Sequence, residues 1–314
     1  MTRGRTSSPV WRVSATSSAE AHADWLELRA LFNKRPSSIE DLVSLLRSGG
    51  TVEELPGGLD AFDQGDEAVQ GVAESALDIA SVRERICGPA YPFNLSAQAL
   101  LPKRLSRQAV YTFLLLLSTY GKGSAKGGED GARLFEDIAG FALGRYIGGN
   151  GTKAGVYQFG FPRRITPAGF RDALDNVCAM MNEGGGSRGR PTRKYQKDAH
   201  LDIVAWIPMP DKNYGKLMMF GQCATGWDWE SKLTELQARE WCEHWMNDTP
   251  PVIPVRTFHM PHTVTIDRWL EHARFGGIIF DRCRLAGFAR GMPFSLRTRV
   301  KNWNYAVLSH MEAP

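Results

Sequence analysis

The sequence has few features of a secreted or membrane protein. Its five cysteines are scattered, their number is odd and none of them forms a CxxC pair. This usage is typical of free thiols in a reducing compartment and argues against a disulfide framework. No signal peptide is visible, and the longest apolar run, residues 113–117, is far too short to cross a bilayer. We therefore expect a cytoplasmic protein.

The chain also has only a small excess of positive charge and few motifs that could bind a metal. The formal net charge is +4 over 314 residues, which permits a nucleic-acid partner without requiring one. Cys242 and His244 lie close together, but no second ligand pair follows at the spacing of a zinc finger. The glycine-rich loop 121–131 follows a predicted helix instead of a strand, which argues against a phosphate-binding loop.

The N-terminal third predicts helices. Residues 1–20 are rich in Ser, Thr, Arg and Ala, and we expect a disordered tail there. Residues 21–105 form a predicted helical region, because apolar residues recur at helical spacing in three segments, 21–32, 39–46 and 63–86. Three helices suggest a helix-turn-helix, but acidic residues dominate 53–77 and disfavour DNA recognition by this part.

The apolar pattern of residues 106–314 predicts alternating helices and strands. The expected fold class is therefore α+β with an α/β core. Hydrophobic residues make up 43% of the chain, enough for a sizeable core. The expected helices are 106–120, 132–146, 167–182, 227–247 and 265–273. The expected strands are 157–161, 201–207, 216–223, 255–258 and 277–280.

The most informative stretch is a predicted hairpin, in which strands 201–207 and 216–223 flank a polar turn. If the turn is symmetric about Lys212, Asp202 stands opposite Gln222 and both side chains share one face. A carboxylate and a carboxamide in an apolar hairpin need a hydrogen-bond partner or a bound ion. A slip of one residue would send the two side chains to opposite faces.

These residues resemble the PD-(D/E)xK superfamily, the restriction-endonuclease-like nucleases. In its Mrr-type branch a D-x-x-x-D strand precedes Q-x-K, and Asp198-x-x-x-Asp202 and Gln222-Cys223-Ala224 match these pieces. The match departs at Ala224, where the family has lysine. In some relatives the lysine moves to the neighbouring helix, where Lys232 is the nearest candidate. The resemblance implies a mixed β-sheet flanked by helices over residues 106–314.

The resemblance also implies a metal site for Mg²⁺ or Mn²⁺. Asp202 would be its bridging carboxylate, and Glu136, on the predicted helix 132–146, a second ligand. The Gln222 carbonyl oxygen and the Cys223 backbone carbonyl would complete the protein ligands, with Asp198 as an auxiliary acid. Lys232 would stabilise the attacking hydroxide. The alternative for Glu136 is an ordinary acid in the first turn of a helix.

A basic loop precedes the predicted Asp202 strand. It is either a mobile solvated loop or a loop that contacts phosphates, and both interpretations stay open. Its candidate DNA-binding residues are Arg188, Arg190, Arg193, Lys194 and Lys197.

Three functional hypotheses follow. The first is a metal-dependent DNA endonuclease that acts as a phage-defence or restriction effector, because several segments also resemble uncharacterised proteins found near phage-defence genes. Activation by another protein subunit is open, and folds of this kind often form homodimers. The second is a catalytically inactive nuclease fold that binds nucleic acid or serves as a scaffold, which the substitution at Ala224 favours. The third is a helical interaction protein in which the hairpin is ordinary core.

Overall fold

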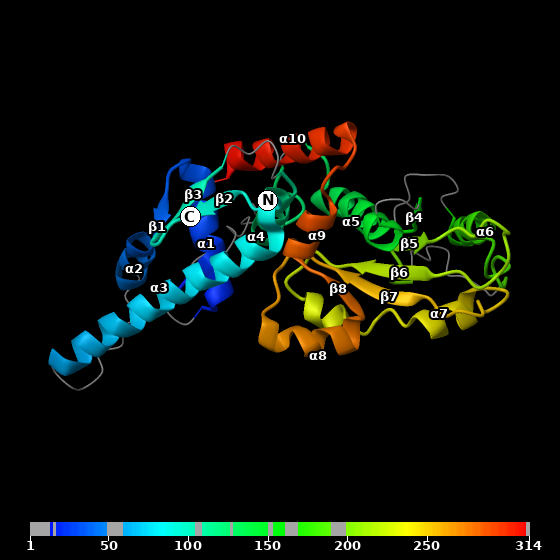
Figure 1. Ribbon diagram of the computed structural model, residues 1–314, viewed down its shortest axis with the longest axis horizontal. Coiled ribbons are helices and arrows are strands. Elements are labelled where there is room, and N and C mark those ends of the chain that lie inside the picture. The colour runs from blue at the N-terminus through cyan, green and yellow to red at the C-terminus, as the bar shows by residue number, and fades with distance from the viewer. Residues whose placement is uncertain are drawn as a thin grey trace, which may run out of the picture. The chain divides into compact units, whose positions relative to one another are not determined.

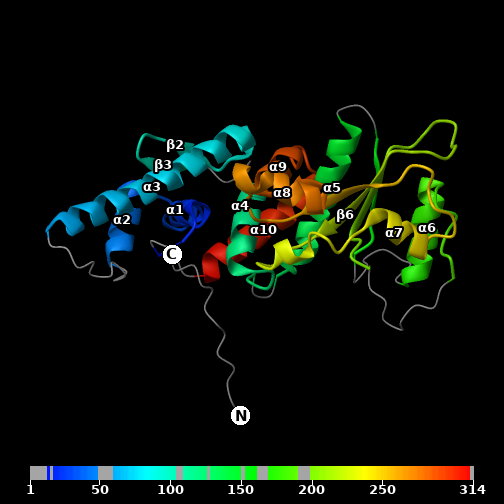
Figure 2. The same cartoon turned by 90° about the horizontal axis from the view of Figure 1, so that it is seen from below.

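The computed structural model describes residues 13–14, 17–48, 59–103, 109–125, 128–149, 153–160, 169–189 and 199–311, with only the backbone for residues 59–66. The chain divides into two compact units, shown in Figures 1 and 2. Unit 1 comprises residues 1–128 and 301–314, and unit 2 comprises residues 129–300. The expected disordered tail lies mostly outside the described residues.

Unit 1 combines helices with a small antiparallel sheet. Its helices are α1 (Ala19–Asn33), α2 (Ile39–Ser48), α3 (Leu59–Cys87) and α4 (Ala109–Tyr120), with a 3₁₀ turn, η1, at Gly88–Ala90. The sheet has the order β1-β3-β2 and consists of β1 (Ser37–Ser38), β3 (Ala99–Pro102) and β2 (Phe93–Leu95). The purely helical prediction for residues 21–105 missed this sheet, because strands of two to four residues leave almost no alternating pattern.

A buried carboxylate explains why α4 belongs to unit 1. Glu27 on α1 is fully buried, and its Oε1 accepts hydrogen bonds from Tyr91 at 2.8 Å, Tyr111 at 2.9 Å and Arg83 at 3.0 Å. Tyr111 lies on α4, so this network ties α4 to α1. The division of the chain therefore falls after residue 128, and the boundary expected at residue 106 differs from it. Helix α10 (Phe294–His310) also contributes to unit 1, because Asn304 donates to the Ala109 carbonyl.

Unit 2 is built on a five-stranded mixed sheet of order β4-β5-β6-β7-β8. Strands β4 (Gly155–Gln158), β5 (Ile203–Trp206) and β6 (Met218–Cys223) pair antiparallel, whereas β6, β7 (Val255–His259) and β8 (Ile278–Phe280) run parallel. The α-helices described in unit 2 are α5 (Gly131–Gly148), α6 (Phe170–Met181), α7 (Ala238–Trp245), α8 (Ile266–Gly276) and α9 (Arg282–Phe288). The predicted α+β class is confirmed at this level.

Helices cover both faces of the sheet (Figure 1). On one face, Gly144 lets α5 approach β4 so closely that a Cβ there would lie 2.8 Å from Val156 Cγ2. On the other face, Phe159, Val204 and Phe220 share an apolar cluster with residues of α6 and α7, including Trp241. Side chains alternate along the strands, so each residue near the end of β5 or β6 is directed to one of these two layers.

The helix predicted for residues 227–247 is wrong as one element. A 3₁₀ turn, η2 (Trp229–Lys232), is followed by an irregular segment and then α7. Trp229 packs in a cluster with Ala224 and Phe258, whereas Trp241 packs in the cluster beneath α6. The tryptophans that suggested one helical stripe therefore serve two separate cores, and the helix breaks between them.

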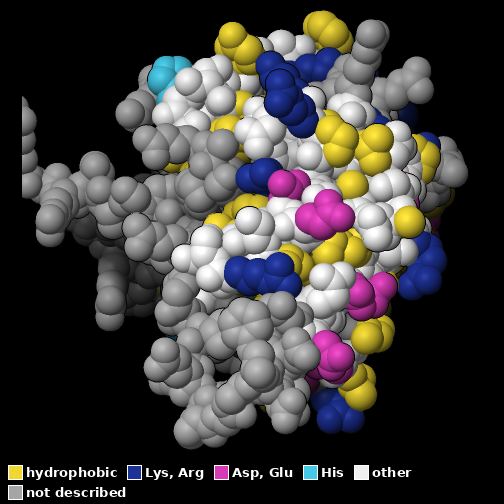
Figure 3. All heavy atoms as spheres, turned by 90° about the vertical axis from the view of Figure 1, so that its left-hand side faces the viewer, with side chains coloured by type: hydrophobic (Ala, Val, Ile, Leu, Met, Phe, Trp, Pro, Cys, Tyr) yellow, Lys and Arg dark blue, Asp and Glu magenta, His cyan; other side chains and the backbone are white. Residues whose placement is uncertain are grey.

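No helix in the part of the chain that the structure describes is long and apolar enough to cross a membrane. Figure 3 shows the face at the α2–α3 end of the view in Figure 1. Basic side chains alternate there with acidic and hydrophobic ones. This visible face therefore gives no sign of a single-sign surface for nucleic acid.

Candidate functional site

The hairpin that carries Asp202 has the predicted register along its strands. Ile203 pairs with Gly221 and Trp206 with Met218, and Ile207 N–H donates to the Leu217 carbonyl. This is the alignment expected of a turn that is symmetric about Lys212. The expectation is therefore confirmed for the paired part of the hairpin.

A β-bulge interrupts this register at Asp202. Its N–H donates to the Gly221 carbonyl at 2.9 Å, although Ile203 is already the partner of Gly221. Two residues of one strand thus stand opposite one residue of the other, and a bulge of this kind redirects a side chain. The predicted pairing of Asp202 with Gln222 consequently does not form.

The Asp202 carboxylate is held at the edge of the sheet. Its Oδ2 accepts the Cys223 N–H at 2.7 Å, which gives a backbone donor of β6 a side-chain partner. On the β4 side, the Phe159 and Gly160 N–H groups donate to the Asp202 carbonyl at 2.7 and 3.0 Å. Backbone bonds on both sides therefore fix the position of this residue.

Glu136 and Asp202 converge at Gly160. A Cβ built on Gly160 would lie 3.0 Å from Glu136 Oε2 and 3.1 Å from Asp202 Oδ1. These two oxygens are therefore no more than about 6 Å apart. Glu136 is contributed by α5, and both acids are partly exposed. The structure thus brings together the two carboxylates that the sequence analysis assigned to one site.

Gln222 belongs to the opposite face. It continues the alternation of Met218 and Phe220, which pack toward α6 and α7. Its side chain is buried, and Nε2 donates to Glu235 Oε2 at 2.6 Å; His200 Nδ1 lies 3.1 Å from the same oxygen. Oε1 of Gln222 has no hydrogen-bond partner among the residues that the structure describes. The contacts therefore join Gln222 to Glu235 and His200.

The family resemblance places a lysine at position 224 or on the following helix at Lys232, and both residues have contacts of their own. Lys232 lies in η2, and its Nζ pairs with Asp228 Oδ1 at 3.1 Å. Ala224 is 2% exposed and packs with Trp229, Leu233 and Phe258. The apolar cluster explains why this position carries a small apolar residue instead of the lysine that the family resemblance implies.

Of the predicted basic residues, only Arg188 is described. Its guanidinium donates to the carbonyls of Glu243 at 2.8 Å and Asn247 at 3.2 Å, so it fastens the loop to the end of α7. This contact supports a structural role for Arg188. The other predicted basic residues and Asp198 lie outside the described residues, namely Arg190, Arg193, Lys194 and Lys197.

Three residues near the site were missed in the sequence: Gly160, Glu235 and His259. His259 is fully buried beside Gly221, and its Nδ1 lies 3.2 Å from the Gln222 carbonyl. Burial lowers the pKa of His259 to about 4, while the bond to the carbonyl opposes the shift. Because a carbonyl only accepts, Nδ1 carries the proton of the neutral ring. A single buried histidine at the end of a strand gives no distinctive sequence signal.

The donor set at Gly160 consists of carboxylate oxygens. Among the described residues, no group of three or more His, Cys, Asp or Glu side chains is arranged to hold a metal. Two carboxylates are nevertheless a common protein contribution to Mg²⁺, which keeps several waters and takes further oxygens from phosphates. The pair Glu136 and Asp202 therefore fits a hydrated Mg²⁺ ion and not a closed structural metal site.

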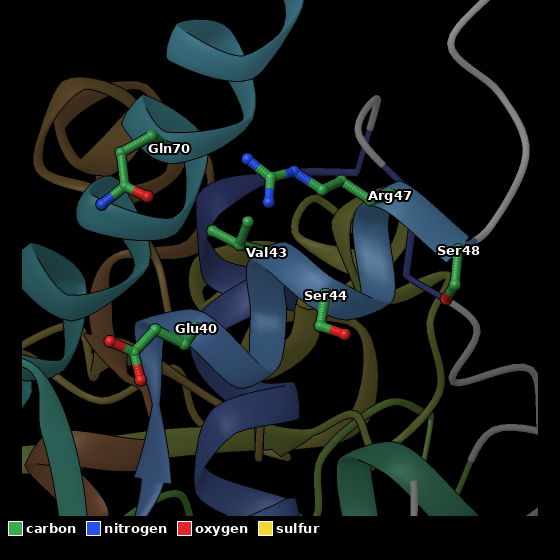
Figure 4. A pocket seen from close by; sticks show the side chains of 6 residues that line it. All are labelled: Glu40, Val43, Ser44, Arg47, Ser48 and Gln70. Carbon is green, nitrogen blue, oxygen red and sulfur yellow. The ribbon is translucent and has the colours of Figure 1, made fainter.

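A separate cavity of about 510 Å³ lies on unit 1 between α2 and α3. Figure 4 shows Arg47 extending from α2 toward α3, which carries Gln70. The lining mixes polar, charged and apolar side chains: Glu40, Val43, Ser44, Arg47, Ser48 and Gln70. It contains no pair of acids or nucleophile–base pair, so we do not assign chemistry to it.

Comparison with known proteins gives no relative, because no protein-family model, curated protein or solved structure matches the chain.

The packing of Ala224 yields a stability prediction. Ala224→Lys places an ammonium group in the cluster of Trp229, Leu233 and Phe258, and should lower the free energy of unfolding by roughly 3 kcal/mol or more. Trp227→Lys, three residues away at a position that is 72% exposed, is the matched control and should cost about 1 kcal/mol or less. Urea denaturation measures both. A stable Ala224→Lys protein with increased Mg²⁺-dependent cleavage would contradict the assignment of position 224 to the core.

The burial of His259 yields a pH prediction. Because its folded pKa of about 4 lies below the ordinary 6.5, only the unfolded chain takes up this proton between these two values. Stability is therefore lost as the pH falls from 6.5 to 4, by about 3 kcal/mol from this group. Urea unfolding of wild type and His259→Gln across this range should give diverging curves, with the steeper loss in wild type. Parallel curves would show that His259 is not held neutral.

Proposed function

We propose that the chain is a metal-dependent nuclease that hydrolyses phosphodiester bonds in DNA, with Glu136 and Asp202 as carboxylate ligands for Mg²⁺ or Mn²⁺. The observation that carries the proposal is the approach of both carboxylates to Gly160. The order of a helix with Glu136, a strand after Asp202 and a hairpin partner also agrees with the PD-(D/E)xK resemblance. On this basis we assign unit 2 to a restriction-endonuclease-like fold.

The ligand chemistry supports a hard cation. Carboxylate oxygens suit Mg²⁺, and one oxygen of each acid lies beside Gly160. When bound, such an ion supplies Lewis-acid stabilisation of the phosphate and acidifies water. The Cys223 backbone carbonyl, a ligand by resemblance, lies on the residue whose N–H holds Asp202.

The protein's own residues would orient these ligands. The Cys223 N–H holds Oδ2 of Asp202, so Oδ1 is the oxygen presented toward Glu136. The bulge and the two backbone bonds from Phe159 and Gly160 hold the backbone of Asp202 in this position. Ligands that are fixed before binding need little reorganisation when charge develops on a phosphate.

A second candidate function is a nuclease fold that has lost catalysis and binds nucleic acid or another protein. Three observations favour it: Ala224 is packed in an apolar cluster, Lys232 pairs with Asp228, and Gln222 is bonded to Glu235 on the other face. This candidate keeps the fold and predicts no cleavage.

The wider role follows from the resemblance alone. A DNA nuclease of this kind would act as a phage-defence or restriction effector in the cytoplasm. By the same resemblance, a partner protein subunit would activate the enzyme, and a homodimer would cut both strands of a duplex.

The direct test is Asp202→Asn, which keeps the shape of the side chain and removes its charge. We expect Mg²⁺-dependent nicking of plasmid DNA to fall at least 100-fold, because the main carboxylate ligand is lost. Asp211→Asn, at an exposed acid in the turn between β5 and β6, is the control and should keep wild-type activity. Circular dichroism and urea unfolding would show that both variants fold.

The outcomes separate the candidates. Cleavage by wild type that disappears in Asp202→Asn supports the nuclease. DNA binding by wild type without cleavage in Mg²⁺ or Mn²⁺ supports the inactive fold. Cleavage that is equal in wild type and Asp202→Asn would overturn the assignment of the site.

A further inference from the structure

Three sulfur-containing side chains meet in the core beneath α6 and α7. Cys178 lies on α6, Cys242 lies on α7, and Met246 directly follows the last residue of α7. All three belong to one apolar cluster, and each is at most 3% exposed. None of them belongs to the site around Asp202.

The sulfur atoms of these residues are close to one another. A Cβ built on Gly184 would lie 2.7 Å from Met246 Sδ and 3.1 Å from Cys178 Sγ, so these two sulfurs are at most about 6 Å apart. The Met246 N–H donates to the Cys242 carbonyl at 2.9 Å, which continues the helical turn by one residue. Side chains four residues apart on such a turn are neighbours, so Met246 brings Cys178 and Cys242 together.

The loop after α6 covers this sulfur cluster. Gly184, Gly185 and Gly186 have φ angles of 79°, 62° and 87°, a run of left-handed conformations that residues with a side chain rarely adopt. This run lets the backbone of Gly184 lie directly against both Met246 Sδ and Cys178 Sγ. Gly185 in the same loop is exposed, so the sulfurs lie just beneath the surface.

The two thiols are held in their neutral form. Burial raises the pKa of Cys178 to about 11, although a backbone hydrogen bond from Gly186 opposes the shift. Burial also raises the pKa of Cys242 to about 12, and the neighbouring Cys178 adds to this shift. Neutral buried thiols react slowly with oxidants, which argues against a redox-sensing pair.

The donor chemistry of the cluster favours a soft cation. Thiolate and thioether sulfurs are the ligands that select Cu(I). Zn²⁺ takes four ligands from cysteine, histidine and carboxylates, so two cysteines and one methionine suit it poorly. Burial acts in the same direction, because Cu(I) with one thiolate is neutral overall and avoids leaving a charge in the core.

We propose that Cys178, Cys242 and Met246 form a buried binding site for one Cu(I) ion, which the glycine loop 184–186 covers. On binding, one S–H bond is replaced by an S–Cu bond, its proton passes to solvent, and copper keeps its oxidation state. The other two sulfurs bind through their lone pairs. The inference goes beyond the proposed nuclease and does not depend on it.

The test is anaerobic titration of the full chain with Cu(I), supplied as its bicinchoninate complex. We expect wild type to take one equivalent of Cu(I) from this competitor. Met246→Leu conserves the core volume but removes the thioether, and should weaken binding at least 10-fold. Met181→Leu, at a methionine that is 1% exposed in the same cluster, is the matched control and should bind as wild type does.

Two cysteine variants identify the thiol ligands. Cys242→Ala should abolish uptake, whereas Cys223→Ser removes the one cysteine that is not buried and should leave uptake unchanged. Circular dichroism and urea unfolding would show which variants fold. X-ray absorption of copper-loaded wild type should detect only sulfur neighbours, and this measurement stands even if a variant misfolds.

The outcomes are distinct. Loss of uptake in folded Cys242→Ala and weaker uptake in Met246→Leu, with both controls unchanged, supports the site. No uptake by wild type, equal affinity in Met246→Leu and wild type, loss of uptake in Cys223→Ser, or nitrogen and oxygen neighbours around copper overturns it. None of these results changes the test of the nuclease at Asp202.

Discussion

The hydrogen bond from the Cys223 N–H to the Asp202 carboxylate determines how the candidate site is built. The bulge at Asp202 takes this residue out of the regular ladder and leaves the Cys223 N–H to be satisfied by a side chain. One carboxylate oxygen is used for that purpose, and the other approaches Glu136 across Gly160. A buried N–H without a partner is costly, so the backbone itself favours this position of the acid.

This arrangement gives the two faces of the sheet different chemistry. Toward α5, two acids approach each other where a glycine leaves space. Toward α7, the buried carboxamide of Gln222 donates to Glu235, which is also close to His200. Glu235 explains the amide at position 222 in physical terms, because a second carboxylate within 2.6 Å of Glu235 would be repelled. Asp202 and Gln222 belong to the two strands of one hairpin but serve opposite layers.

Much of this architecture could be predicted from the sequence, because strong periodic patterns determine it. The helix that carries Glu136 and the two hairpin strands follow from apolar spacing and turn residues, whereas the symmetry of the turn was an assumption that the observed register confirms. The bulge could not be predicted, because one extra residue in a ladder leaves the alternation on either side intact. The break between Trp229 and Trp241 was missed for a related reason: the sequence shows aromatic spacing but not which core each ring enters. Gly160 carries no signal until the acids around it are located.

Diffraction from crystals of the chain soaked in Mn²⁺ tests the central claim most directly, since the ion's anomalous signal locates it without reference to activity. The account predicts a peak between α5 and the Asp202 bulge, within about 2.5 Å of carboxylate oxygens of both Glu136 and Asp202. A peak at Gln222, Glu235 and His200 instead, or no peak near Gly160 at saturating Mn²⁺, would contradict it.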